Sequence, residues 1–346
     1  MTTFQRSLLA LAALTSFGAH AQSNATLYGR IDVSVNALRF SGPNATSVRT
    51  VSSDTSYWGL RGVEDLGGGN SAYFKLESQF QADTGVQGNA TTFFNRESFV
   101  GLRSERLGSL ALGAQYTPHI ALTGKVDPFS RGYLGHIANL FQGAPRGYQP
   151  LMNNAVHYTS PNLGGVTGRI MVGAREGGLG TTHGAGLEYG AGPLVLGVSY
   201  DALNVTAASV GLPAVQPSVR SRTIGLGASY DFKVARLMGY YQTNDADRLS
   251  RVDGWMLGAI VPVGQGAIRV GYSANNLTTT GEAKQLALGY THLLSKRTTV
   301  YTTIARTSND GSTASLWPGR QDLAGRGLPA AGQDVRGFQV GIRHLF

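Results

Sequence analysis

The chain of 346 residues contains 48 glycines, 12 prolines and no cysteine, and its 29 basic and 20 acidic residues give a net charge of +9. Only 14% of the residues are charged, against about 25% in soluble domains, yet the mean hydropathy is −0.08 because glycine and uncharged polar residues replace the missing charges. This composition excludes a disordered chain, a coiled coil and a nucleic-acid partner, and the lack of cysteine excludes disulfides, cysteine-based zinc sites and a catalytic thiol.

The first 21 residues have the features of a secretory signal peptide. Arg6 gives a positive start, an apolar segment follows over 8–14, and Ala19-His20-Ala21 is an A-x-A cleavage site. We therefore expect a signal peptide over 1–21 and an exported domain over 22–346, with a net charge of 28 − 20 = +8. No later segment reaches the roughly 18 apolar residues that a transmembrane helix needs.

Several segments of the exported domain alternate with a period of two residues. In 224–232, every second residue is apolar or aromatic and the residues between are Gly, Ser and Asp; 194–201, 268–272 and 286–290 repeat the pattern. This is the period of β-strands with one apolar face. Because the other face carries small and polar residues, the pattern predicts strands with lipid on one side and water on the other.

Short and long connections alternate between these strands. Seven short turns are expected at 67–70, 106–108, 161–164, 190–192, 231–233, 264–266 and 294–296, and eight longer polar connections near 40–55, 83–94, 117–152, 175–182, 202–221, 243–252, 275–284 and 308–333. Fifteen connections join sixteen strands, and their alternation is typical of short periplasmic turns and long external loops. We therefore predict an all-β fold over 22–346, a transmembrane 16-stranded antiparallel β-barrel in the cell outer membrane.

The third long connection, over 117–152, is a candidate for the constriction of a channel. A sixteen-stranded barrel is too wide for its own side chains to fill and encloses water. A loop of this length in a compact domain is usually functional. It carries Lys125, Asp127, Arg131 and Arg146, and we expect it to fold into the barrel; an external surface loop is the alternative.

Alternation also predicts which charged strand residues face the channel. If apolar residues such as Ile31, Leu60 and Leu76 face lipid, their charged neighbours face inward, because Lys or Arg in mid-membrane costs roughly 2–4 kcal/mol. The residues expected to line the channel are Arg30, Asp32, Arg61, Lys75, Glu77, Arg103 and Arg269. Their basic excess predicts a moderate, salt-dependent preference for anions.

A series of short segments, in order along the exported domain, carries a family resemblance. The segments are 26–32, 58–69, 74–80, 95–102, 124–129, 153–161 and 341–346. Together they resemble the Gram-negative general, non-specific trimeric porins of the beta-proteobacterial and neisserial type. The resemblance implies a homotrimer, an inward-folded third loop, and a C-terminal Phe346 that the outer-membrane assembly machinery reads as a signal. We expect outer-membrane lipid and lipopolysaccharide as further partners.

Two positions depart from that family's pattern. Such porins commonly have Gly-Arg-Gln at the end of the fifth strand, where this chain has Gly113-Ala114-Gln115. They also commonly have an Arg just before the Asn-Asn of the sixth strand, where this chain has Leu151. That Arg belongs to the charged wall of the family's constriction, so the full arginine series does not carry over. Arg146 is the candidate to replace it.

The sequence contains no H-E-x-x-H, Walker loop or G-x-S-x-G motif. We expect no enzyme, and no catalytic, cofactor or metal site. The predicted function is a general diffusion porin for passive passage of ions and small hydrophilic solutes. The alternatives are a substrate-specific outer-membrane channel and, after it, a barrel adhesin or a barrel enzyme.

Overall fold

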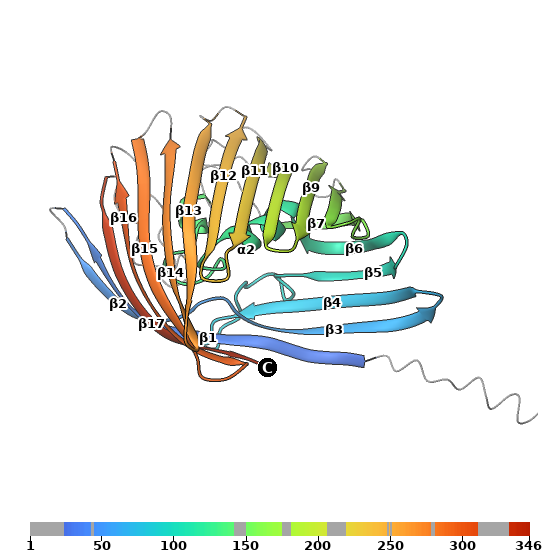
Figure 1. Cartoon of the computed structure of the whole chain (residues 1–346), viewed down its shortest axis with the longest axis horizontal. Coiled ribbons are helices and arrows are strands. Elements are labelled where there is room, and N and C mark those ends of the chain that lie inside the picture. Colours follow the sequence, from blue (N-terminus) through green and yellow to red (C-terminus); the bar gives the residue numbers. More distant parts are fainter. Residues whose placement is uncertain are drawn as a thin grey trace, which may run out of the picture.

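The protein forms one antiparallel sheet that closes on itself, as a computed structural model shows (Figure 1). The structure describes residues 24–42, 45–141, 150–174, 181–205, 219–247, 249, 251–277, 281–310 and 332–346. The predicted signal peptide therefore lies outside the described residues. Within these ranges, no helix has both the length and the apolar composition to cross a bilayer.

The strands follow one another around the barrel in chain order. They are β1 (Asn24–Phe40), β2 (Ser47–Ser53), β3 (Ser56–Gly67), β4 (Asn70–Phe80), β5 (Ser98–Ser104), β6 (Gly108–Tyr116), β7 (Leu151–Thr159), β8 (Val166–Gly173), β9 (Thr182–Ala191), β10 (Leu194–Val205), β11 (Val219–Asp231), β12 (Arg236–Ala246), β13 (Val252–Val263), β14 (Gly266–Leu277), β15 (Gly281–Leu293), β16 (Thr298–Asn309) and β17 (Val335–Leu345). The last strand, β17, pairs with β1 and closes the barrel. Because every edge is paired, all backbone groups of the wall can be satisfied in lipid.

β2 and β3 are two halves of one barrel strand. Residues 33–39 of β1 pair with β2, and residues 24–30 pair with β3, so the two halves run in line along β1. Asp54 and Thr55 separate them, and Thr55 has a left-handed backbone with φ of 59°. The seventeen segments in the described ranges thus form sixteen barrel strands, as predicted. The expected connection over 40–55 is wrong in its extent, because 47–53 pairs with β1 and leaves only 41–46 between strands.

The connections alternate in length as predicted. Short turns join β3 to β4, β9 to β10 and β13 to β14 at one end of the barrel, which we call the periplasmic end. Long connections lie at the opposite, outer end. Several strands continue further toward that end than their sequence pattern indicated; β15, for example, begins at Gly281, where pairing with β14 starts.

Side chains alternate between a lipid-facing outer face and the lumen. On β1, Leu27, Ile31 and Val35 are 59%, 42% and 58% exposed, whereas Asp32 and Ser34 between them are buried. The same alternation continues around the barrel, and exposed apolar residues form a continuous outer belt. Charged side chains on the lumen side are therefore kept from lipid.

The connection between β6 and β7 enters the barrel, the inward position expected of the third loop. It contains α2 (Pro118–Val126) and α3 (Ala138–Phe141), and α2 packs against β9–β12 on their lumen side (Figure 1). Alternation could not predict these helices. Pro118 starts α2 in the position where its missing N–H costs nothing.

Candidate functional site

Glycines on the lumen face of β9–β15 provide the space that the third loop occupies. Leu122 of α2 packs on Gly197 and Gly227, and a Cβ atom at Gly227 would lie 3.0 Å from Leu122 and 3.1 Å from Val126. Pro118, Pro128 and Phe129 lie in the same way on Gly184, Gly186, Gly258, Gly271 and Gly289. These glycines thus form the surface on which the third loop packs, and a side chain at any of them would crowd the loop.

Asp127 organises the turn after α2. Its Oδ1 accepts a hydrogen bond from the Phe129 N–H at 2.9 Å, and its Oδ2 accepts from the N–H groups of Arg131 and Ile137 at 2.9 and 3.2 Å. The side chain is 2% exposed. The expectation that Asp127 presents its charge in the constriction is therefore corrected: backbone donors surround its carboxylate, and it shapes the loop instead.

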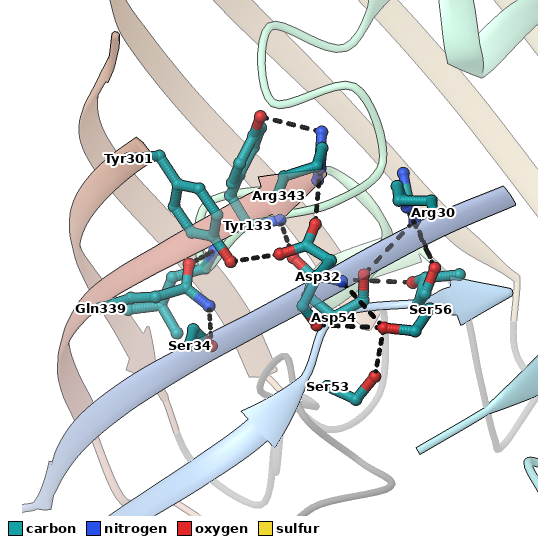
Figure 2. Close-up of polar contacts among 12 residues, drawn as sticks. Arg30, Asp32, Ser34, Ser53, Asp54, Ser56, Tyr133, Tyr301, Gln339 and Arg343 are labelled. Atoms are coloured by element: carbon teal, nitrogen blue, oxygen red, sulfur yellow. Dashed lines mark hydrogen bonds and ion pairs between the residues drawn. The ribbon is translucent and has the colours of Figure 1, made fainter. Parts of the chain in front are cut away.

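The tip of the third loop is held by the strand break between β2 and β3 and by β17 (Figure 2). The Tyr133 N–H donates to Oδ2 of Asp54 at 2.5 Å, and the Leu134 N–H donates to Oε1 of Gln339 at 2.8 Å. Since α2 rests on β9–β12, the loop extends across the lumen from that wall to β17 and β1. The break in the strand is thus an attachment point for the loop.

Asp32 lies beside this attachment and is fully buried. Nε of Arg343, on the neighbouring β17, is 2.5 Å from Oδ2 of Asp32, and the Tyr301 hydroxyl donates to Oδ1 at 2.7 Å (Figure 2). Arg343 also donates to the Tyr133 hydroxyl at 2.8 Å, with its guanidinium 4.3 Å from that ring's centroid. The carboxylate is therefore neutralised and covered, and Asp32 presents little charge to the channel.

Arg30, two residues before Asp32 on β1, donates hydrogen bonds to the backbone at the same strand break. Its Nε and Nη2 donate to the Thr55 carbonyl at 3.0 and 2.8 Å, and Nη2 also donates to the Asp54 carbonyl at 3.3 Å. These carbonyls are available because the ladder is interrupted at 54–55. In the part of the chain that the structure describes, no carboxylate forms an ion pair with Arg30.

Lys75 and Glu77 belong to a compact, charge-balanced group on β4. Nζ of Lys75 is 2.9 Å from Oε1 of Glu77 and 2.5 Å from Oε2 of Glu97, and Nε of Arg96 is 3.1 Å from Oε2 of Glu77. The Tyr28 hydroxyl donates to Glu77 at 2.7 Å. Two cations meet two carboxylates. Sequence reasoning did not include Arg96 and Glu97, because they come from the connection before β5, whose path no alternation predicts.

Arg61 and Arg103 differ from this group in being exposed. Their guanidinium carbons lie 4.6 Å from the Tyr28 ring and 4.7 Å from the Tyr73 ring. No acidic side chain in the described ranges forms an ion pair with either arginine. A cation above an aromatic face keeps its full charge and its access to water. Arg61 therefore acts on the channel, whereas Arg103 lies at the periplasmic rim, level with Asp65, because both are opposite Ser71.

Among the basic residues of the third loop, Lys125 faces the wall on which α2 rests, and Arg131 contacts the loop itself. Nζ of Lys125 and Nη1 of Arg169 lie 2.5 and 2.7 Å from the same oxygen, Oε2 of Glu188, which leaves one positive charge in excess. Arg131 donates to Oγ1 of Thr123 at 2.9 Å. Arg269 donates to the Pro128 carbonyl. Arg146 lies outside the described residues, so its replacement of the family's missing arginine stays a prediction.

The lumen face as a whole presents cations and hides acids. Strand register places eight basic residues there: Arg30, Arg61, Lys75, Arg103, Arg169, Arg236, Arg269 and Arg343. The acids on the lumen face of the described strands are Asp32, Glu77, Glu188 and Asp201, all at most 5% exposed, and Asp65 and Asp231, which cap turns at the periplasmic rim. The sequence analysis missed Arg169, Arg236 and Arg343, although Ile170, Leu237 and Ile342 beside them carry the same alternation signal.

Phe346 takes part in the closure of the barrel. The Gly29 N–H donates to the Phe346 carbonyl at 3.1 Å, and the Phe346 N–H donates back to the Gly29 carbonyl at 3.2 Å. Its ring occupies the space that a side chain at position 29 would need. The last residue is thus part of the wall.

Comparisons with known proteins agree with this architecture. Residues 7–312 match the model of a family described as Gram-negative porin. The chain is 35% identical to outer membrane porin protein 32 of Delftia acidovorans, over 99% of this chain and 100% of that protein. Its structure is similar to that of an anion-selective porin from Comamonas acidovorans, with a TM-score of 0.79 and 29% identity over 94% of this chain and 100% of that one. An outer membrane protein of Vibrio cholerae in its trimer form shares the fold, with a TM-score of 0.68, 14% identity and coverage of 94% and 99%.

Proposed function

Because the chain belongs to the Gram-negative porin family, we propose that its channel is lined and constricted by the basic residues described above and that they select moderately for anions. The protein is an outer-membrane general diffusion porin: its closed barrel holds a water-filled passage for ions and small hydrophilic solutes. The relatives are named as channels, not as enzymes.

The observation that supports the anion preference is the difference in exposure between lumen charges of opposite sign. Arg61 and Arg103 are exposed, whereas Asp32 and Glu77 are 0% and 2% exposed. Exposed cations lower the entry barrier for anions and raise it for cations. The solved relative from Comamonas acidovorans is titled anion-selective, which supports the same preference here.

We expect the preference to be moderate. The Debye length is about 8 Å at physiological ionic strength, so mobile ions screen wall charges across a wide passage. Lys75 and Lys125 also share their charge with carboxylates at 2.5 Å. We propose that the constriction is lined by five basic residues: Arg30, Arg61, Lys75, Lys125 and Arg131. Asp127 does not line it and instead stabilises the turn of the third loop.

The test is the reversal potential of single channels in a salt gradient. Arg61→Gln removes an exposed lumen charge and should shift the reversal potential toward cation preference. Arg222→Gln is the matched control, because Arg222 lies on the outer face of β11 and pairs with Asp245 and Asp247 at 3.6 and 2.9 Å. Cation selectivity in the unmodified channel, or equal potentials for both variants, would refute the assignment.

We also propose that three copies assemble, that residues 1–21 are removed on export, and that the assembly machinery reads Phe346. Closed barrels resist unfolding because every ladder group is paired in lipid. Unheated protein should therefore migrate as a trimer on mild gels with a strand-type circular dichroism spectrum. Deletion of Phe346 should reduce the amount of assembled trimer, and an unchanged amount would argue against its role as a signal.

A further inference from the structure

Glu188 on β9 joins the last turn of α2 to the barrel wall. Its Oε2 lies 2.5 Å from Nζ of Lys125, in that last turn, and 2.7 Å from Nη1 of Arg169 on the neighbouring β8. Three positions further along the chain, Ala191 ends β9 at the short turn to β10. The contact between α2 and the wall therefore lies in the periplasmic half of the lumen.

A single oxygen of Glu188 contacts both cations. Because Nζ of Lys125 and Nη1 of Arg169 both lie against Oε2, the two nitrogens are within about 5 Å of each other and repel. The second oxygen, Oε1, is buried and has no hydrogen-bond partner in the part of the chain that the structure describes. Within the same ranges, no other carboxylate lies within ion-pair distance of Lys125 or Arg169. One negative charge thus offsets the repulsion between two positive ones.

The three side chains differ in their access to water. The side chain of Lys125 is 46% exposed, that of Arg169 is 18% exposed, and that of Glu188 is only 6% exposed. Lys125 is therefore the charge of this group that ions in the lumen meet, and Glu188 is the hidden charge that offsets it. Since Lys125 is carried by the loop on a flexible stem, its ammonium can also turn from the wall toward the passage.

The other ion-pair group of the lumen wall, around Glu77, is balanced differently. Lys75 contacts both Glu77 and Glu97, so a carboxylate would remain beside this lysine if Glu77 were neutralised. Neutralisation of Glu188 would leave two adjacent cations and no carboxylate. Of these two groups, the one around Glu188 therefore has the larger effect on how much unpaired positive charge the channel presents.

We propose that Glu188 limits the anion preference of the channel by neutralising Lys125 and holding its ammonium against the wall. Glu188 is 5% exposed, so it acts on permeating ions through Lys125 and is a positioning residue. The inference rests on the proposed function and deepens it, because it names an acid that sets the strength of the preference. Basic residues alone determine its sign.

The test measures reversal potentials of the assembled full-length protein in planar bilayers, in salt gradients centred on 0.1 M and on 1 M. Glu188→Gln keeps the size of the side chain and removes its charge. The ratio of anion to cation permeability should rise about twofold near 0.1 M and change little near 1 M, because the Debye length falls from about 10 Å to about 3 Å. A loop that is merely loosened would change the conductance without this dependence on salt.

Two further variants show whether the effect passes through Lys125. Glu282→Gln is the matched control, since it also removes an acid from a lysine, Lys284 at 2.6 Å, but on the outer face of β15; its reversal potential should equal that of the unmodified protein. The double variant Lys125→Gln/Glu188→Gln removes one charge of each sign. It should return to the potential of the unmodified channel.

The outcomes separate this inference from the proposed function. Anion preference that is equal in the unmodified channel and in Glu188→Gln would overturn the role of Glu188 and leave the function intact, whereas cation preference in the unmodified channel would refute the function itself. If repulsion prevents Glu188→Gln from assembling, the double variant is compared with Lys125→Gln. The double variant should prefer anions more strongly, and equal potentials of these two variants would overturn the proposal.

Discussion

The seat of α2 on β11 predicts that a larger residue at position 227 narrows the channel. A Cβ atom there would lie 3.0 Å from Cδ1 of Leu122 and 3.1 and 3.2 Å from the two Cγ atoms of Val126. These separations are roughly 0.3–1 Å shorter than favourable carbon contacts. Valine adds two methyl groups beyond Cβ. Because β11 is paired with β10 and β12 at this residue, the strand cannot retreat, and α2 must move toward the channel axis.

We expect Gly227→Val to destabilise the docking of the third loop and not the barrel wall. Overpacking of a close-packed contact costs about 1–3 kcal/mol, while valine itself is favourable in a strand. Single-channel conductance of the variant should therefore decrease with the barrel intact. Gly239→Val is the matched control, since Gly239 lies on the outer face of the adjacent β12 and its nearest neighbour, Cδ2 of Leu257, would be 3.6 Å away.

The control variant should conduct like the unmodified protein. If Gly227→Val assembles and conducts at the same level as Gly239→Val, then α2 does not border the passage that limits conductance. A loss of assembly in both variants would instead show that the wall tolerates no side chain at either position, and the assigned seat of the loop would be wrong.

Two further perturbations act on the same loop. Deletion of residues 125–146 should raise single-channel conductance without loss of assembly, because the segment that crosses the lumen is removed; unchanged conductance would place the constriction in another element. Burial lowers the pKa of His119 to about 3 and that of His136 to about 4, from 6.5, so the docked loop binds fewer protons than the undocked loop as pH falls from about 6.5 toward 4. Docking of the loop should therefore weaken by up to about 1.4 kcal/mol per pH unit for each histidine. We expect more current noise in single-channel recordings at pH 4.5 than at pH 7.5. Identical noise at the two pH values would contradict this prediction.

The barrel could be predicted from sequence because lipid imposes a simple pattern. The alternation that places Ile31 outward also places Asp32 inward, and the structure has both residues there. The same rule extends to every strand, since a misplaced charge on the lipid face would cost several kcal/mol. The number of strands followed from the alternating lengths of the connections.

The interior could not be predicted in the same way, because it depends on contacts between distant segments. Lys75 meets Glu97 only through the path of the connection before β5. Asp54 meets the Tyr133 N–H only because one barrel strand is broken and the third loop crosses the lumen. Local periodicity predicts neither contact. For this reason several charged residues that were expected to line the channel unpaired are in fact paired.

The pairing of β1 with β17 has a consequence for how the molecule forms. Gly29 and Phe346 exchange two backbone hydrogen bonds although 317 positions separate them along the chain, a loop whose closure costs about 5 kcal/mol in chain entropy. Until that seam is closed, every partly formed sheet has two open edges that can pair with other chains. Strand pairing elsewhere is local, so this single seam sets the cooperativity of folding. A circular permutant that joins the two ends and opens the chain at the turn 264–265 would turn that distant pairing into an ordinary hairpin and move the seam to β13 and β14, without altering the wall.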